Sequence, residues 1–272
     1  MRMENLVRSG GLWMLILMLT GCASMPGADP RDPWEPMNRK IYQFNDQVDR
    51  MVLRPVASAY NRITPRPVRA GVSNFFNNAS DYWSLINNVA QLKVPQTVEM
   101  TMRVSVNTVM GLGGVLDIAS EVGLERHKED LGETLGRYGM PTGPYLVLPL
   151  LGPSTVRDAA TLVADSQGNP VNHIHPIHTR NQLTALNLVD TRASFLRAGQ
   201  MLQEAALDEY SFTRDAYLQK RLNDTFDGHP PEDPDPDADV STSPSAGAPD
   251  GSPVAAGAAP AAPVPAASAP AQ

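Results

Sequence analysis

The sequence predicts an all-α fold in a single domain. Apolar residues recur at steps of three and four over several long stretches, which is the spacing of one face of a helix. Strand signals are few, and the best of them is interrupted by a proline. About 195 residues remain once the compositionally distinct ends are set aside, which is enough for one domain.

The first predicted helix covers residues 36–52. Pro36 suits its first turn, and Pro55 is expected to end it. Its apolar stripe consists of Met37, Ile41, Phe44, Val48 and Met51 with Val52.

Further helices are predicted over residues 68–90, 94–110 and 181–221. The other face of the 68–90 helix carries mostly Asn, Ser and Gln, which suits either a water-filled lumen or plain solvent. The 181–221 stretch holds one or two helices. The apolar stripes are Val68, Val72, Phe75 with Phe76, Ala79, Trp83, Ile86 and Ala90 in the first helix, and Val98, Met102, Val106 and Val109 with Met110 in the second.

Residues 145–151, "YLVLPLL", give the best strand signal, which Pro149 weakens. The segment fits either a buried strand-like piece or a lipid-facing wedge, and burial is favoured. Thr155 or Ser154 is then expected to cap a helix, with Asp158 in capping-box register to Thr155. Arg157 and Asp158 are expected to have structural roles.

The N-terminus has the features of a secretory signal peptide over residues 1–21. Arg2 and Arg8 precede a short apolar run. The run is shorter than the roughly 20 residues that a helix needs to span a bilayer. Leu19-Thr20-Gly21-Cys22 resembles the bacterial lipobox, and Cys22 is the single cysteine of the chain. That resemblance implies that Cys22 carries a diacylglycerol and an N-acyl chain, which together suffice for stable anchoring. No other cofactor is expected.

Two further boundaries follow from composition. Residues 22–31 form a short acylated linker, and residues 32–227 form the helical domain. Residues 228–272 are rich in Pro, Ala and Asp, so they cannot bury enough apolar area to offset their chain entropy and are predicted to be disordered. The acidic net charge lies mostly in this tail, and no basic patch points to a nucleic-acid partner.

Signatures of catalysis are weak, and the chain is not expected to be an enzyme. His173, His175 and His178 resemble a metal cluster, but no carboxylate or cysteine is near in sequence and Pro176 interrupts regular geometry. We therefore predict no metal site there. "GLGGVLD" is not a dinucleotide fingerprint, no P-loop is present, and Ser154 lacks the nucleophile elbow of a lipase.

Five stretches resemble the MlaA/VacJ lipoproteins in order and spacing. They are "DPWEPMNRKIYQFND" (32–46), "RPVASAYNRITPRPVRAGVSNFFNN" (54–78), "NTVMGLGGVLDIA" (107–119), "LGETLGRYGMPTGPYLVLPLLGPSTVRDA" (131–159) and "RDAYLQKR" (214–221). The resemblance implies a ring of amphipathic helices in the inner leaflet of the outer membrane, anchored from the periplasmic side.

The same resemblance implies a function and partners. Family members remove phospholipids from the outer leaflet through a central amphipathic channel, are held by a trimeric porin, and pass the lipid to a periplasmic carrier. A non-catalytic lipidated scaffold that tethers envelope proteins remains the alternative. The apolar stripes likewise remain open to two interpretations, a soluble helical core or a lipid-facing surface.

Glycines flank the charged segment "ERHKED" (125–130) within residues 111–139. Glycine permits backbone angles that other residues resist, so the segment is predicted to move as a hinged hairpin over a pore. The resemblance implies a channel hairpin at this place, and the alternative is two helix ends joined by a surface loop. The predicted hinge residues are Gly111, Gly113, Gly114, Gly136 and Gly139.

Overall fold

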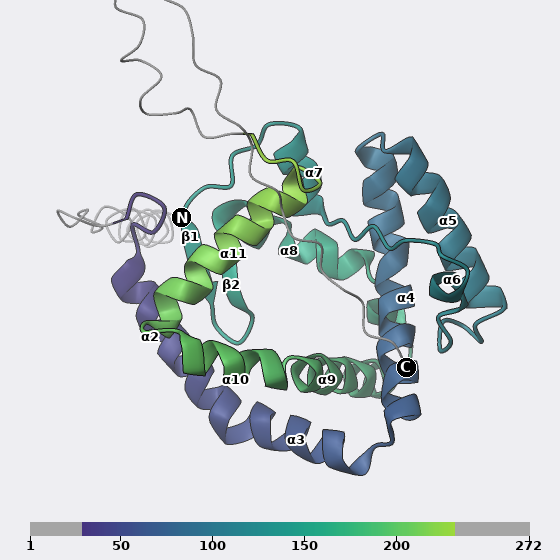
Figure 1. Cartoon of the computed structure of the whole chain (residues 1–272), viewed down its shortest axis with the longest axis horizontal. Helices are drawn as coiled ribbons and strands as arrows, with labels where there is room; N and C mark the ends of the chain where they lie inside the picture. The colour runs from purple at the N-terminus through teal and green to yellow at the C-terminus, as the bar shows by residue number, and fades with distance from the viewer. Residues whose placement is uncertain (1–28, 232–272) are drawn as a thin grey trace, which may run out of the picture. The chain divides into compact units, whose positions relative to one another are not determined.

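The computed structural model describes residues 29–231, and these residues confirm the all-α class (Figure 1). Cys22 and the predicted signal peptide lie outside the described residues, as does the tail from residue 232 onward. The α-helices are α2 (Glu35–Val48), α3 (Arg54–Ile63), α4 (Arg66–Ala90), α5 (Val94–Val109), α6 (Ile118–Glu121), α7 (Leu131–Arg137), α8 (Val156–Gly168), α9 (Ile177–Ser194), α10 (Leu196–Ala205) and α11 (Glu209–Thr225). The strands are β1 (Tyr145–Leu148) and β2 (Gly152–Thr155). The stretch after α8 ends in a 3-10 turn, Pro170–His173.

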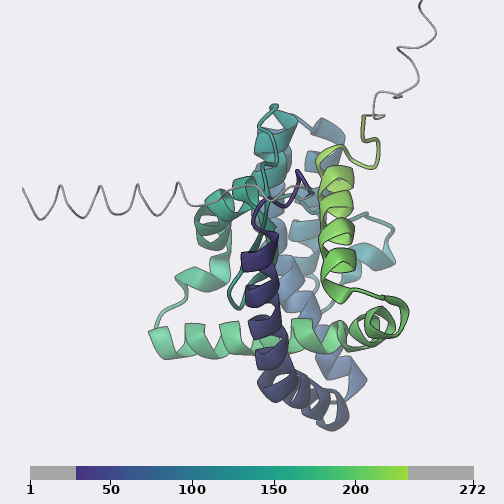
Figure 2. The same cartoon turned by 90° about the vertical axis from the view of Figure 1, so that its left-hand side faces the viewer.

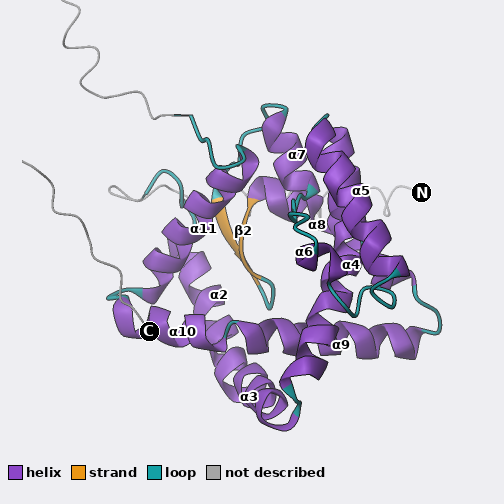
Figure 3. Cartoon of the chain, turned by 45° about the vertical axis from the view of Figure 1, so that its right-hand side comes forward, coloured by secondary structure: helices purple, strands orange, loops and turns teal. Residues whose placement is uncertain are grey.

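Within residues 29–231 the helices pack in a closed circuit. Starting from α2, neighbours in contact are α3, α9, α4 and α8, and the β1–β2 hairpin joins α8 back to α2. Figure 1 shows these elements as a frame, and Figure 3 shows the hairpin inside it, beside α11. Helix α5 packs along α4 and carries α6. The 181–221 stretch thus contributes to three helices instead of the one or two expected.

The hairpin is the first of two small apolar clusters. Tyr145 and Val147 of β1 are fully buried and pack with Tyr210 of α11, while Tyr42 of α2 meets the Tyr210 ring edge-on at 5.7 Å. Figure 2 shows α2 and α11 side by side. Burial of the 145–151 segment is confirmed for Tyr145 and Val147 but is wrong for residues 149–151, which are exposed in the turn. Because Pro149 lies in this turn, no ladder hydrogen bond is lost there. The second cluster joins α4 to the 3-10 turn through Phe76, Ala79 and Val171.

The N-terminal segment is tied to elements far along the chain. The backbone N–H of Tyr145 donates to the carbonyl of Arg31 at 2.8 Å, and Asn38 donates to the carbonyl of Tyr145 at 3.1 Å. The buried Asp32 carboxylate accepts from Asn38 at 2.8 Å and from the hydroxyl of Tyr210. These contacts close the circuit between its first and last elements.

The prediction that Pro55 ends the first helix is wrong. Residues Asp49–Leu53 form a π-helical segment that leads directly into α3. Pro55 then lies in the first turn of α3, where its missing N–H costs no helical hydrogen bond. The wider π turn absorbs the steric conflict between the proline ring and the preceding turn, so the chain continues as helix.

The distribution of polar and apolar side chains between interior and surface is inverted relative to an ordinary soluble domain. Within residues 29–231, 22 polar or charged side chains are buried against 11 hydrophobic ones. More large hydrophobic side chains are exposed than are buried. Since a large exposed apolar surface marks a contact with another protein or with lipid, the outer faces of these helices are built for a partner phase other than water.

The predicted apolar stripes lie on this outer surface. Met37, Phe44 and Met51 are exposed on α2 and the π segment, and Val98 and Val109 are exposed on α5. On α4 the stripe divides, because Phe76 and Ala79 are buried while Val68 and Ile86 are exposed. The soluble-core interpretation is therefore wrong for most of these positions. None of the helices among the described residues is both long and apolar enough to cross a bilayer.

The polar face of α4 is buried, contrary to both expectations for it. Asn88 is fully buried, and its side-chain amide donates to the carbonyls of Ser84 at 2.8 Å and His127 at 3.1 Å. Ser84 donates to the carbonyl of Glu129 at 3.1 Å, and Gln91 donates to the Glu129 carboxylate at 2.7 Å. The Asn and Ser side chains thus donate hydrogen bonds to backbone carbonyls of the irregular 122–130 segment. These carbonyls need such donors because the segment forms no helix of its own.

Ion pairs fasten the 122–130 segment to α4 and α5. Lys93, almost fully buried, contacts the Glu129 carboxylate at 2.7 Å, and Arg126 contacts the buried Asp81 at 2.6 Å. Burial raises the pKa of Asp81, even though Arg126 and Arg103 lower it. Buried charges persist only when paired, so removing one partner is much more costly than the pair is stabilising.

Lys93→Met should therefore lower the free energy of unfolding by about 3–5 kcal/mol, because Glu129 would remain buried without a cation. Denaturant titration of the detergent-solubilised chain, followed by circular dichroism, measures this loss. Arg50→Ala is the control, since its pair with Asp46 at 2.9 Å is exposed and should be worth less than about 1 kcal/mol. Equal losses in the two variants would contradict the structural role of Lys93.

Candidate functional site: the Arg221 pocket

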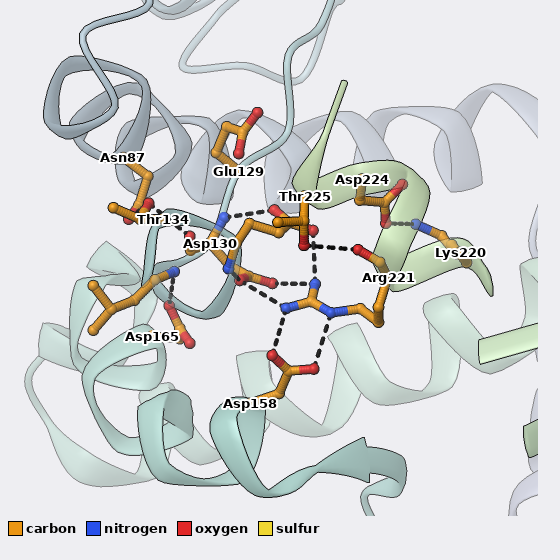
Figure 4. A network of polar contacts seen from close by, with 12 residues as sticks. Asn87, Glu129, Asp130, Thr134, Asp158, Asp165, Lys220, Arg221, Asp224 and Thr225 are labelled. Atoms are coloured by element: carbon orange, nitrogen blue, oxygen red, sulfur yellow. Dashed lines mark hydrogen bonds and ion pairs between the residues drawn. The ribbon is translucent and has the colours of Figure 1, made fainter. Parts of the chain in front are cut away.

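Arg221 of α11 is the centre of a dense polar cluster (Figure 4). Its Nη1 lies 2.8 Å from Asp130 Oδ2 and 2.6 Å from Glu133 Oε1. Its Nη2 and Nε contact the two carboxylate oxygens of Asp158 at 2.8 and 3.0 Å. This bidentate fork joins α7, α8 and α11 at one point.

The acids of the cluster also shape the local backbone. Asp130 caps α7 by accepting from the N–H of Glu133 at 2.8 Å, and Glu133 accepts in return from the N–H of Asp130 at 2.9 Å. Thr155 caps α8 by accepting from the N–H of Asp158 at 3.2 Å, so the predicted cap is confirmed. The carboxylates of Asp130 and Glu133 are thus fixed by the cap of α7, and the backbone of Asp158 is fixed by the cap of α8.

Electrostatics divide the acids into two kinds. Burial raises the pKa of Glu133 to about 8, aided by the Asp130 charge and opposed by Arg221. Burial also acts to raise the pKa of Asp158, but the hydrogen bonds and charge of Arg221 outweigh it and hold this pKa below its usual range. Burial therefore favours the protonated form of Glu133, whereas Arg221 favours the ionised form of Asp158.

A cavity of about 400 Å³ opens beside this cluster. The buried side chains of Glu133, Arg221 and Thr161 line its inner part, and Lys128, Lys220 and the 66% exposed Leu151 line its outer part. Leu148, Pro153 and Leu162 add further apolar surface. The pocket is thus polar within and carries both cations and leucines near its mouth.

The predicted hinge residues lie outside this pocket and differ among themselves. Gly113 has a φ of +72° and open space where a side chain would lie, whereas Gly114, with a φ of +92°, approaches Asn78 so closely that a Cβ would lie 2.5 Å from it. Gly111 and Gly136 are also packed closely, while Gly139 has a φ of +88° in open space. The structure therefore separates glycines needed for close packing from those needed only for their backbone angle.

The three histidines do not gather. His173 lies in the 3-10 turn with its Nε2 2.6 Å from the carbonyl oxygen of Gln167, and His175 and His178 are exposed. Among residues 29–231, no group of three His, Cys, Asp or Glu side chains is arranged to hold a metal ion.

Comparison with known proteins places this architecture. The family model described as MlaA lipoprotein matches residues 30–224. The chain belongs to the MlaA lipoprotein family.

Individual relatives are similar in sequence to this chain over most of their length. The intermembrane phospholipid transport system lipoprotein MlaA of Escherichia coli K12 is 33% identical over 221 residues, which cover 79% of this chain and 87% of that protein. An uncharacterised Rickettsia typhi protein is 33% identical over 195 residues, covering 70% and 76%. A solved structure described as the structural basis for maintenance of bacterial outer membrane lipid asymmetry matches with a TM-score of 0.63 and 31% identity, covering 73% of this chain and 99% of that one.

Sequence reasoning did not identify the Arg221 cluster in this MlaA-family chain. Arg214 and Arg221 stand two turns apart on one face of α11, and each is buried among carboxylates from distant segments. The seven-residue spacing of these two arginines, on a helix with few apolar residues, was the feature of the sequence that could have indicated the cluster. The acids that pair with Arg221 come from loops and helix starts 63–91 residues away, which spacing alone does not bring together.

Glu133→Gln should weaken the dependence of stability on pH. Because burial raises the pKa of Glu133 to about 8 in the folded chain, folding takes up a proton wherever the unfolded chain, with its ordinary pKa of 4.5, has lost it. The contribution of Glu133 is therefore complete below pH 4.5, declines as pH rises, and is lost above about 8.

Denaturant titrations from about pH 5 to 9 should show a steeper decline in unfolding free energy for the wild type than for the Gln variant. Glu125→Gln, at an exposed position, is the control and should follow the wild type. Parallel curves for all three proteins would mean that Glu133 is ionised in the folded chain.

Proposed function

We propose that this chain is an outer-membrane lipoprotein of an intermembrane phospholipid transport system and helps to keep the outer membrane asymmetric. In this proposal it removes phospholipids from the outer leaflet through a central amphipathic passage and passes them to a periplasmic carrier. The names of the MlaA relatives and the described purpose of the similar solved structure support it.

The inverted polarity of the helices is the observation that carries the proposal. Exposed Phe44, Ile86 and Val98 lie on helices whose buried faces hold Asn38, Asn88 and Arg103. A domain of this kind is suited to lie among acyl chains while holding a polar interior, as amphipathic helices do at a membrane interface.

The physical task explains why such a domain is needed. Drawing a phospholipid with about 30 tail carbons fully into water costs on the order of 20 kcal/mol or more. Rapid transfer requires a path that shields the tails and keeps the headgroup solvated. Helices with apolar outer faces and polar inner faces, arranged in a closed circuit, supply both environments to one lipid.

Anchoring and partners complete the proposal. Diacylglyceryl and N-acyl chains on Cys22 would hold the domain on the periplasmic side of the outer membrane, with a trimeric porin as its membrane partner. The chain has no catalytic role in this scheme. A lipidated scaffold would share the anchor and the porin but would not move lipid.

The scaffold and the transporter differ in one measurement. Expression of this chain in Escherichia coli lacking its own MlaA should lower the phospholipid exposed on the cell surface, measured with a membrane-impermeant amine reagent. A scaffold would co-purify with the porin and leave surface phospholipid at the level of the deletion strain. That second result would overturn transport and retain the tether.

Cys22→Ala tests the anchor. Without the thiol no acyl chain can be attached, so the variant should accumulate as uncleaved precursor outside the outer-membrane fraction. Membrane fractionation and the mass of the N-terminal peptide measure this. Mature, active protein in the outer membrane from the Ala variant would rule out the lipobox interpretation.

Gly113→Ala tests the proposed hinge of residues 111–139. At a φ of +72° an alanine is disfavoured by about 1–2 kcal/mol, so a gate near balance would shift by roughly tenfold in population. Surface phospholipid should change in either direction while protein level and porin co-purification stay constant. Gly199→Ala in the helical backbone of α10, with no close contact, is the control. Normal surface phospholipid in the Gly113 variant would mean that Gly113 serves only the local turn and that the segment is no gate.

A further inference from the structure

We propose that the Arg221 pocket is a subsite for the headgroup of an aminophospholipid, that is, a lipid with both a phosphate and a primary ammonium. The inference rests on the proposed transport function for its ligand class. It adds the site within the domain that receives the polar end of the lipid and the headgroup that the site prefers.

Most of the pocket's acids are fully engaged. Both carboxylate oxygens of Asp130, Glu133 and Asp158 already accept hydrogen bonds from Arg221, from helix-cap N–H groups or from the Tyr217 hydroxyl. These groups fix the shape of the pocket, and they leave little capacity for a ligand.

Two other carboxylates at the pocket each keep an open oxygen. Asp165 accepts from Trp83 Nε1 and from the N–H of Leu131 through Oδ1 alone, and Asp224 pairs with Lys220 through Oδ2 alone. No donor among the described residues reaches Asp165 Oδ2 or Asp224 Oδ1. Figure 4 shows these two side chains on different sides of the Arg221 cluster. An ammonium brings three N–H donors and suits either one of these oxygens.

A cation without a partner stands at the same pocket. Lys128 is exposed and makes no ion pair with any described residue, in contrast to Lys220, which is bound to Asp224. A phosphate oxygen can accept from the Lys128 ammonium at the cost of little rearrangement. The charges therefore match a zwitterion, with the acids in excess: five acidic and three basic side chains line the cavity.

The apolar surface of the pocket accounts for the remainder of the ligand. Leu151 and Leu162 are exposed beside the polar interior, and Leu148 and Pro153 adjoin them on the hairpin. A cavity of about 400 Å³ holds a headgroup and glycerol but not two acyl chains. The chains would leave over the leucines toward the apolar outer surface.

Photo-crosslinking tests the subsite on the full lipidated chain in detergent micelles. The probes are phosphatidylethanolamine and phosphatidylglycerol, each with the same photoreactive group on one acyl chain. Phosphatidylethanolamine should label the hairpin and α8 several-fold more than phosphatidylglycerol, which lacks the ammonium. Equal labelling by the two lipids, or labelling that avoids residues 148–162 and 217–224, would overturn the inference.

Two variants separate the ends of the headgroup. Asp165→Asn with Asp224→Asn removes both charges, keeps an oxygen for Trp83 and Leu131, and should lower phosphatidylethanolamine labelling by about fivefold to tenfold without lowering phosphatidylglycerol labelling. Lys128→Ala should lower labelling by both lipids. The matched controls are Asp46→Asn, from an equivalent exposed pair on α2, and Lys40→Ala, an exposed lysine, and neither should alter labelling.

The surface-phospholipid assay of the complemented strain keeps this inference distinct from the transport proposal. Restored asymmetry without selective labelling would refute the subsite and leave transport intact. Selective labelling without restored asymmetry would support the subsite and refute transport in that host. The pocket geometry predicts that the Asn variant loses labelling by phosphatidylethanolamine alone, whereas Lys128→Ala loses labelling by both lipids.

Discussion

The desolvation of charge is the constraint on which this fold depends. Arg221 is held at the junction of α7, α8 and α11 by three carboxylates. The same pattern recurs where Lys93 pairs with Glu129 and where Arg103 of α5 pairs with Asp81 and Asp117. Each of these cations costs several kcal/mol to remove from water, and each is offset only by close placement of its partners. The geometry of these ion pairs and hydrogen bonds therefore fixes the positions of the helices more closely than an apolar core would.

This arrangement follows from the surface that the domain presents. With its apolar side chains directed outward, the chain has few left for its interior, and two small clusters around Tyr145 and Phe76 supply the apolar part. In the proposed membrane setting the outward surface would meet acyl chains, where hydrophobic burial gives no preference for the protein interior. Specific hydrogen bonds and ion pairs then have to define which compact state is reached.

The sequence predicted the class, the helix positions and the family, because periodicity and motif order are local properties. It did not predict which side of each stripe faces inward: the spacing of Phe44 or Val98 is the same for a buried face and for a lipid-facing one. The Asn and Ser residues of α4 were misassigned for the same reason, since their partners lie in an irregular segment some 40 residues away. Pro55 misled because a π turn before it is not visible in residue spacing.

The contacts between the first and last elements have a consequence for how this protein is made. Asp32 meets Tyr210, which lies 178 residues further along, and Arg31 meets Asp215. A chain emerging N-terminus first must wait, with Tyr145 and Val147 of the hairpin uncovered, until α11 supplies Tyr210. Assembly with so many distant contacts is slow, and the waiting intermediate is prone to aggregate in an aqueous compartment. Folding is therefore completed only after the last helix has been made and has docked against the first elements of the chain.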